Sequence, residues 1–210
     1  MVKVFDLDGT LLDSNEIWRA VDLKFGKLMH LDITKEYLDF VSHATFPVSA
    51  AYTKQYFQLS LSEKEIMDIW YAMVDEAYAH QLPLKPGAQE YLQHCASQGD
   101  SMVMYTSSVP SLCYAALRRH DIEHYFSHIY FAQDIGLEKK YPESFSSLSE
   151  MLGAVPSDCT LFDDSPLACT AAHQAGWNVV GVYDDLFHAE QSTLKQNCDR
   201  VVLRLDECIK

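Results

Sequence analysis

The chain has 210 residues, of which 48% are hydrophobic and 22% are charged, and its formal net charge is −14. This is the composition of a globular protein, and the length allows one large domain or one domain that carries a smaller insert. The acidic balance excludes nucleic acid as a general partner, because the chain would repel a phosphate backbone. The sequence also has no basic run to attract an anionic membrane, so we expect no membrane partner.

The cysteines and the first residues favour a reducing compartment. No two of the six cysteines are separated by only two or three residues, which argues against a zinc knuckle or a redox pair. Residues 1–5 lack the apolar stretch of a secretory signal, and no segment reaches the ~18 unbroken apolar residues of a membrane span. We therefore expect a cytoplasmic protein whose thiols are reduced.

In chain order, the first element is a short, apolar and β-branched strand of the kind that is buried on both faces of a parallel sheet. Runs of this kind lie at residues 2–5, 102–105, 129–131, 160–162 and 179–182, and residues 201–203 are a sixth candidate. Helical patterns separate the later strands and begin near residues 86, 110, 142 and 166. This alternation predicts an α/β fold with a parallel sheet and helices on both faces.

A helical stretch interrupts the alternation directly after the first strand. Four helical patterns lie at residues 16–29, 35–41, 48–57 and 62–80, with no convincing strand among them. Ser62 and Glu65 form a capping box at the start of the last pattern, and the sequence PLKPG follows it at residues 83–87. We predict a doubly wound, Rossmann-like core formed by residues 1–13 and 82–210, with a helical cap domain at 14–81.

Polar residues follow the strands at the sheet edge where ligands of parallel sheets bind. They are Asp6, Asp8, Thr106, Ser107, Lys139, Asp163 and Asp164. Crowded carboxylates need a cation, and hard oxygen ligands select Mg²⁺. A phosphate would then find positive charge on Lys139 and a donor on Thr106. An Asp can attack phosphorus to give an aspartyl-phosphate, and a second acid two residues later can protonate the leaving oxygen.

The first motif, FDLDGTLLDS at residues 5–14, closely resembles that of the haloacid dehalogenase-like (HAD) hydrolase superfamily. The other three motifs of the superfamily follow in order, and the helical insert is similar to the C1 cap of its phosphoglycolate phosphatase and β-phosphoglucomutase branch. The resemblance implies that Asp6 is the nucleophile and a Mg²⁺ ligand. It implies that Asp8 is the general acid/base and a ligand through its backbone carbonyl, and that Asp164 is a further metal ligand.

The second and third motifs supply the phosphate contacts. The resemblance implies that the Thr106 hydroxyl, with the Ser107 amide beside it, binds the phosphate together with a lysine. That lysine is Lys139 by its spacing to Pro142, although Lys140 stands where the family usually has proline. Each residue also has an ordinary interpretation: Thr106 as a helix cap, and Lys139 as a surface lysine.

The fourth motif departs from the family pattern. Asp163 replaces the usual glycine before Asp164, and Ala168 occupies the position of a further acidic residue. Asp163 is therefore a candidate for an outer-shell partner or an alternative metal ligand. The pair Asp163 and Asp164 also has an ordinary interpretation as the start of a helix.

Within the superfamily that this sequence resembles, an Asp at the position of Asp8 implies phosphoryl transfer to or from oxygen, because the dehalogenase members have no Asp there. We predict a phosphoric monoester hydrolase, a Mg²⁺-dependent phosphatase of a small phosphorylated metabolite. One alternative is a sugar phosphomutase, whose pattern carries a His ten residues after the acid/base; here that residue is Trp18. Another is a non-catalytic regulatory or binding module on the same fold. The oligomeric state is left open, and a monomer is compatible with the sequence.

The cap carries no motif that identifies the substrate. Its polar candidates for substrate contact are His43, Thr45, Tyr52 and Lys54. Each of them also has an ordinary interpretation as a surface or packing residue.

Overall fold

The computed structural model of the protein describes residues 1–209. A parallel sheet forms the centre of the molecule. Its strand order is β3-β2-β1-β4-β5-β6, and every neighbouring pair is parallel. The strands are β1 (Val2–Phe5), β2 (Ser101–Thr106), β3 (His128–Phe131), β4 (Cys159–Asp163), β5 (Asn178–Val182) and β6 (Arg200–Val202). The first strand therefore lies in the middle of the sheet, and the chain reverses its direction of winding on either side of it.

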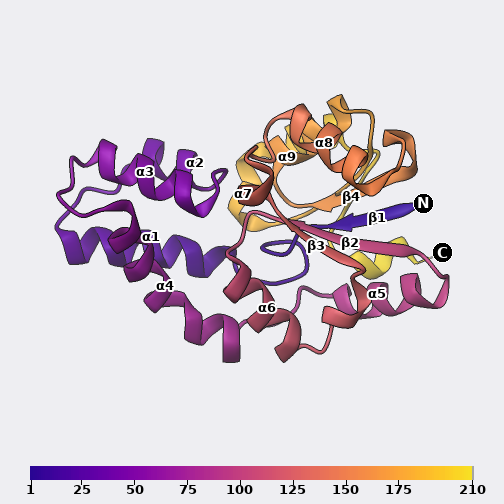
Figure 1. Ribbon diagram of the computed structural model, residues 1–210, viewed down its shortest axis with the longest axis horizontal. Coiled ribbons are helices and arrows are strands. Elements are labelled where there is room, and N and C mark those ends of the chain that lie inside the picture. Colours follow the sequence, from indigo (N-terminus) through magenta and orange to yellow (C-terminus); the bar gives the residue numbers. More distant parts are fainter. Residues whose placement is uncertain (210) are drawn as a thin grey trace.

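Helices lie on both faces of this sheet and bury its central strands (Figure 1). Helices α5 (Ala88–Ser97) and α6 (Pro110–Arg119) lie on one face, and α8 (Pro142–Leu152) and α9 (Pro166–Gln174) lie on the other. Two shorter helices, α7 (Ala132–Ile135) and α10 (Gln191–Asn197), complete this part of the chain.

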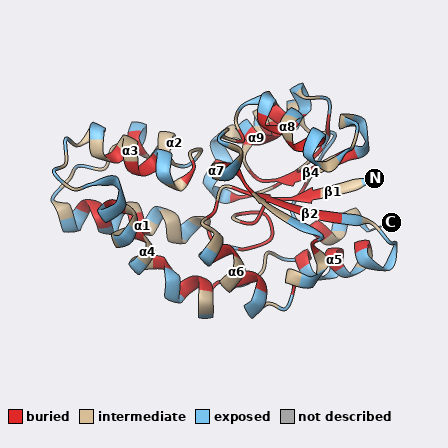
Figure 2. Cartoon of the chain, viewed as in Figure 1, coloured by how far each residue is buried: buried red, intermediate tan, exposed pale blue. Residues whose placement is uncertain are grey.

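Alternate residues of each strand enter two separate hydrophobic cores. Phe5 stacks on Phe162 at 4.6 Å between ring centroids in one core, whereas Val4 and Leu161 belong to the other. Both sides of β1 are thus buried (Figure 2), which is why its sequence is continuously apolar instead of alternating.

The chain between β1 and α5 forms four helices beside the sheet, at the left of Figure 1. They are α1 (Asn15–Met29), α2 (Lys35–Val41), α3 (Phe46–Tyr56) and α4 (Glu63–His80). Trp70 of α4 holds three of them together, because its ring packs edge-on against Phe25 of α1 and Phe46 of α3. The capping box of Ser62 and Glu65 is present at the start of α4, as predicted.

The two connections between the sheet and the four helices run side by side. The Asp13 N–H donates to the Pro83 carbonyl at 3.0 Å, and the Lys85 N–H donates to the Leu11 carbonyl at 2.8 Å. Leu12 and Leu84 form an antiparallel bridge between them. The two connections are therefore paired with each other, and α4 also packs against α6 beside the sheet.

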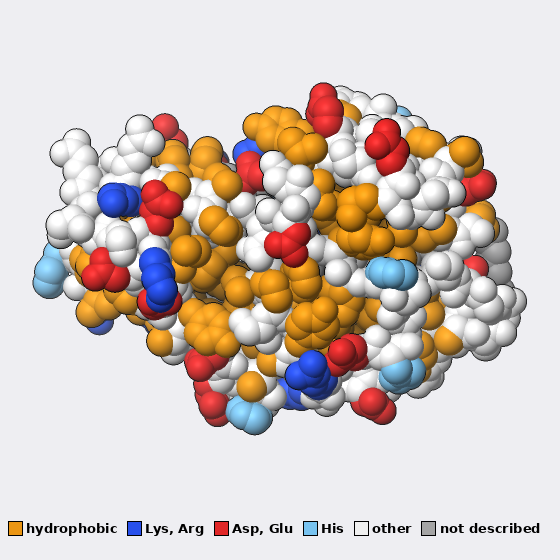
Figure 3. All heavy atoms as spheres, in the orientation of Figure 1, with side chains coloured by type: hydrophobic (Ala, Val, Ile, Leu, Met, Phe, Trp, Pro, Cys, Tyr) orange, Lys and Arg blue, Asp and Glu red, His pale blue; other side chains and the backbone are white. Residues whose placement is uncertain are grey.

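The predicted α/β fold with a doubly wound parallel sheet is confirmed, including the sixth candidate strand. The sequence patterns missed α7 and α10, and α3 begins at Phe46, earlier than predicted, with Pro47 in its first turn. No helix within residues 1–209 combines the length and the apolar character needed to cross a membrane. On the face seen in Figure 3, lysine and arginine side chains are scattered and form no continuous basic patch.

Candidate active site

A cavity of about 600 Å³ lies where the carboxyl ends of the central strands meet helices α1–α3. We call it the active-site cavity. The ends of the central strands form its floor. Phe5 pairs with both Met104 and Phe162, and the Asp6 N–H donates to the Phe162 carbonyl at 2.9 Å. Asp6 therefore emerges beside the ends of β2 and β4.

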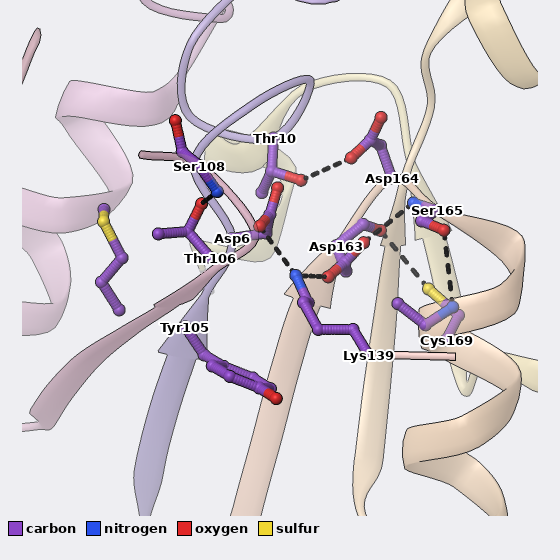
Figure 4. Close-up of polar contacts among 12 residues, drawn as sticks. Asp6, Thr10, Tyr105, Thr106, Ser108, Lys139, Asp163, Asp164, Ser165 and Cys169 are labelled. Atoms are coloured by element: carbon purple, nitrogen blue, oxygen red, sulfur yellow. Dashed lines mark hydrogen bonds and ion pairs between the residues drawn. The ribbon is translucent and has the colours of Figure 1, made fainter. Parts of the chain in front are cut away.

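Three buried acids meet at this floor, and we call them the carboxylate cluster: Asp6, Asp163 and Asp164. Each offers a carboxylate oxygen, and the three oxygens lie within 4.8 Å of one another. Lys139 pairs with two of them, because its Nζ lies 2.7 Å from Asp6 Oδ1 and 2.5 Å from Asp163 Oδ2 (Figure 4). The cluster thus holds three buried carboxyl groups but one buried ammonium group, which contacts two of them.

The charges in this cluster are not balanced. Burial raises the pKa of Asp6 to about 7 against the opposing pull of Lys139, and the charges of Asp163 and Asp8 raise it further. Burial, followed by the charges of Asp163 and Asp6, raises the pKa of Asp164 well above its usual range. Burial lowers the pKa of Lys139, but its two carboxylate partners outweigh this and raise it. An excess of buried oxygen ligands with negative charge fits a hard divalent cation such as Mg²⁺.

Asp164 has hydrogen-bond donors but, among residues 1–209, no cation partner. Thr10 Oγ1 donates to it at 3.2 Å and Asn15 Nδ2 donates at 2.8 Å. Gly9 lies directly against the same carboxylate, with a φ of +79°, and a Cβ atom at this position would collide with it. The turn after β1 therefore requires glycine for its backbone conformation and for space. Thr10 and Asn15 were not identified as site residues from the sequence.

The Asp8 carboxylate contacts the helical part of the chain. It accepts hydrogen bonds from Ser14 Oγ at 2.6 Å and from the hydroxyl of Tyr78, which Trp18 Nε1 contacts in turn at 2.7 Å. Burial and the Asp8 charge raise the pKa of Tyr78 well above its usual range, so the phenol is a hydrogen-bond donor. The sequence analysis missed Tyr78. Its signal is its place four residues after Val74 and eight after Trp70, on the buried face of α4.

Hydroxyl groups and a second lysine line other parts of the cavity. Thr106 and Ser107 line it at the end of β2, and Thr106 Oγ1 accepts the Ser108 N–H at 3.0 Å, which leaves its proton free for another acceptor. Lys140 does not reach the carboxylate cluster, because its Nζ pairs with Glu138 at 2.5 Å and lies over the Phe40 ring.

Asp163 joins the lysine to the start of α9. Its second oxygen, Oδ1, accepts the Ser165 N–H at 2.9 Å, and Ser165 caps α9. Ala168 lines the cavity but brings no polar atom, so the acid of the fourth motif beside Asp164 is Asp163.

The four polar candidates of the helical part divide between the cavity and its surroundings. His43 lines the cavity, with Nδ1 at 3.3 Å from Ser165 Oγ and its ring stacked on Phe187, and burial lowers its pKa. The Thr45 N–H donates to Glu138 at 2.9 Å. Tyr52 stacks on Phe40. Neither Tyr52 nor Lys54 lines the cavity.

Comparison with known proteins identifies the family. The sequence profile of the haloacid dehalogenase-like hydrolases matches residues 3–182. This chain belongs to that family. It is 26% identical to a phosphorylated carbohydrates phosphatase of Thermotoga maritima over 82% of this chain and 80% of the relative. It is 29% identical to a phosphoglycolate phosphatase of Aliivibrio fischeri, over 82% and 79% of the two chains.

The same fold is found in solved structures. The crystal structure of CbbY from Rhodobacter sphaeroides in complex with phosphate superposes with a TM-score of 0.82, at 17% identity, over 98% of this chain and 95% of that one. The family, the fold and the hydrolase class predicted from the sequence are therefore confirmed for this HAD-like hydrolase. The roles of the individual site residues stay predictions.

Proposed function

We propose that this HAD-like hydrolase is a Mg²⁺-dependent phosphatase, and that it cleaves a small phosphorylated metabolite through an aspartyl-phosphate on Asp6. The observation that carries the proposal is the carboxylate cluster with Lys139 inside a cavity large enough for a small ester. The relatives that are named as phosphatases support the same reaction class. We expect the enzyme to act in the cytoplasm.

The carboxylate cluster has the donor set that Mg²⁺ requires. The ligands would be carboxylate oxygens of Asp6 and Asp164 and the backbone carbonyl of Asp8, with Asp163 as an outer-shell partner or an alternative ligand. When bound, Mg²⁺ would neutralise the excess negative charge and polarise an oxygen of the phosphoryl group.

The first half of the reaction transfers the phosphoryl group to the protein. A carboxylate oxygen of Asp6 attacks phosphorus, while Lys139 and the donors of Thr106 and Ser107 bind the non-bridging oxygens. The bond between phosphorus and the ester oxygen breaks, and Asp8 gives that oxygen a proton as it leaves.

The second half returns the enzyme to its starting state. Asp8, now ionised, takes a proton from a water molecule whose oxygen attacks phosphorus. The bond between phosphorus and Asp6 breaks, which releases inorganic phosphate and regenerates both carboxyl groups. Tyr78 and Ser14 hold the Asp8 carboxylate at the cavity and so orient it for both proton transfers.

Helices α1–α4, within residues 14–81, act as the cap in this proposal, and residues 1–13 and 82–210 form the core. The paired connections at Leu12 and Leu84 provide a hinge between the two parts. Asn15 contacts Asp164 and Tyr78 contacts Asp8, so closure of the cap and completion of the catalytic site are coupled. A closed cap also excludes bulk water from the aspartyl-phosphate.

A panel of phosphate esters tests the reaction class. We expect release of inorganic phosphate that requires Mg²⁺ and is lost with a chelator. Conversion of β-glucose 1-phosphate to glucose 6-phosphate with little free phosphate would instead identify a mutase. Absence of turnover for every ester, with and without Mg²⁺, would indicate a non-catalytic module and contradict the proposal.

A further inference from the structure

The two oxygens of the Asp8 carboxylate have different surroundings. Oδ1 accepts both of the hydrogen bonds made to this side chain, from Ser14 Oγ at 2.6 Å and from the Tyr78 hydroxyl. Within residues 1–209, no hydrogen bond reaches Oδ2. Asp8 lines the active-site cavity, whereas Ser14 and Tyr78 are buried and do not line it. The two donors therefore hold Oδ1 from outside the cavity, and Oδ2 has no partner in this part of the chain.

This arrangement suits both protonation states of Asp8. A carboxyl group that is protonated on Oδ2 keeps Oδ1 as a carbonyl oxygen, and the two lone pairs of that oxygen match the two donors. An ionised carboxylate accepts the same two hydrogen bonds without rearrangement. The proton that Asp8 exchanges during catalysis therefore belongs on Oδ2.

The Tyr78 hydroxyl alone does not guarantee this division, because a phenol can accept a hydrogen bond as well as donate one. If Tyr78 accepted from Asp8, the proton of the carboxyl group would lie on Oδ1, between buried side chains. A proton on Oδ1 would be directed away from an ester in the cavity. The direction of the hydrogen bond between Tyr78 and Asp8 thus decides which oxygen carries the proton.

Trp18 fixes that direction. Its Nε1 lies 2.7 Å from the oxygen of Tyr78, and an indole N–H can only donate. The Tyr78 oxygen therefore accepts from Trp18 and directs its own proton to Asp8. Packing holds the indole in place, because its ring lies edge-on against Phe46 at 5.7 Å and against Tyr78 at 6.0 Å between ring centroids.

We propose that Trp18 is a positioning residue for the acid/base: it orients the Tyr78 hydroxyl toward Asp8 Oδ1 and so keeps the exchangeable proton on Oδ2. In the first half of the reaction, this proton moves from Oδ2 to the ester oxygen as the bond between that oxygen and phosphorus breaks. In the second half, Oδ2 takes a proton from the water whose oxygen attacks phosphorus. The inference rests on the proposed phosphatase activity and adds to it the oxygen that carries the proton and the residue that selects this oxygen.

The test compares kcat/KM, which reports the first half of the reaction, for two esters. Glycerol 2-phosphate has an alkoxide leaving group that needs a proton, whereas the leaving group of p-nitrophenyl phosphate needs little protonation. Trp18→Phe should lower kcat/KM about fivefold for glycerol 2-phosphate and less than about twofold for p-nitrophenyl phosphate. The inhibition constant of inorganic phosphate should stay within about twofold of the parent value, because Trp18 acts through Tyr78 and not on the phosphate.

A double variant shows whether Trp18 acts through Tyr78. Tyr78→Phe should itself lower kcat/KM for glycerol 2-phosphate, because Asp8 loses a donor. Adding Trp18→Phe to this variant should lower the value by less than about a further twofold, because the hydroxyl group between Trp18 and Asp8 is then absent.

Two further proteins control for packing. Trp177 is the matched control, because its Nε1–H donates to Ser149 Oγ at 2.8 Å in the other hydrophobic core. Trp177→Phe should leave the ratio of the two kcat/KM values unchanged. The benzothienyl analogue of tryptophan at position 18 keeps the size of the ring and removes only the N–H, so it tests the inference even if Trp18→Phe fails to fold. It should show the same selective loss for glycerol 2-phosphate.

No loss with this analogue, an equal loss for both esters, or additive losses in the double variant would overturn the inference. Hydrolysis of p-nitrophenyl phosphate without any hydrolysis of glycerol 2-phosphate would also overturn it, because Asp8 would then protonate no leaving group. Each of these results would leave the Mg²⁺-dependent release of phosphate intact. No turnover of either ester in the presence of Mg²⁺ would contradict the proposed function as well as the inference.

Discussion

At the scale of single residues, the acids of this site differ in what surrounds them. Asp6 shares Lys139 with Asp163, whereas Asp164 has donors but no cation and Asp8 is held by hydroxyl groups. In the proposed mechanism, these chemically identical side chains have different tasks. We propose attack on phosphorus for Asp6 and proton transfer for Asp8, whose carboxylate is held by Ser14 and Tyr78.

The contact between Tyr78 and Asp8 predicts a kinetic effect. We expect Tyr78→Phe to lower kcat roughly tenfold for alkyl phosphates, because Asp8 loses one donor that orients it. The loss should be much smaller for p-nitrophenyl phosphate, whose leaving oxygen needs little protonation. Steady-state kinetics with both esters measures this difference. An equal loss for both would show that Tyr78 has only a structural role.

Asp22 predicts a dependence of stability on pH. Its pKa of about 7 in the folded protein lies above the ordinary 3.8, so the folded state binds its proton more tightly. The Asp22 carboxyl group therefore lowers the stability of the fold at high pH. The free energy of unfolding falls as the pH rises from about 4 through 7, by about 1.4 kcal/mol per pH unit at most. Asp22→Asn should remove this loss.

Urea unfolding at pH 5 and pH 8 checks the prediction for Asp22. The free energy of unfolding of Asp22→Asn should exceed that of the parent protein by more at pH 8 than at pH 5. A difference independent of pH would show that the pKa of Asp22 is not raised in the folded protein.

At the scale of elements, many residues of the site lie in the short connections that follow the strands. The turn after β1 carries Asp8, Gly9 and Thr10, and the connection after β4 carries Asp164 and Ser165. The sequence predicted the strands and most helices, because their apolar periodicity is local. It could not predict that Tyr78 reaches Asp8, because this contact depends on how α4 packs beside the sheet, 70 residues away in the chain.

The same limit applies to the two lysines after β3. Spacing favoured Lys139, but only the path of the chain between α7 and α8 shows which side chain turns inward. Lys139 is buried against Asp6, and Lys140 lies at the cavity rim with Glu138. Two adjacent lysines look alike in the sequence, because they differ only in the direction in which their side chains point.

Gly9 gives a prediction for the turn after β1. Gly9→Ala should destabilise the protein by more than the roughly 1–2 kcal/mol expected for alanine at positive φ, because the new Cβ also collides with Asp164. Gly136→Ala is the matched control, since Gly136 has a φ of +76° but no atom within 4 Å of the Cβ position. Urea unfolding of both variants makes the comparison, and equal losses would contradict the close approach of Gly9 to Asp164.

At the scale of the whole molecule, the acidic residues that give the net charge of −14 are in two kinds of environment. Most acidic side chains lie on the surface, but those of the carboxylate cluster are buried together and repel one another. A bound divalent cation would relieve this repulsion and tie the core to the cap through Asp164 and Asn15. The molecule should therefore be more stable with Mg²⁺ than without it.

Thermal unfolding measures this effect. Mg²⁺ at a hundred times its dissociation constant should add about 2.7 kcal/mol and raise Tm by about 5–10 °C. Asp164→Asn should raise Tm without Mg²⁺, because it removes a buried charge, and should abolish most of the Mg²⁺-dependent increase. The exposed Asp158→Asn is the control and should behave like the parent. An unchanged response in Asp164→Asn would show that the ion binds elsewhere.

The central claim is that Asp6 accepts the phosphoryl group, and the rate of phosphate release in Asp6→Asn tests it most directly. With phenyl phosphate and Mg²⁺, we expect this variant to lose at least about a thousandfold in kcat, because an amide oxygen cannot replace the attacking carboxylate. Asp158→Asn should remain within about twofold of the parent in the same assay. Release of phosphate by Asp6→Asn at the rate of the parent would contradict the claim.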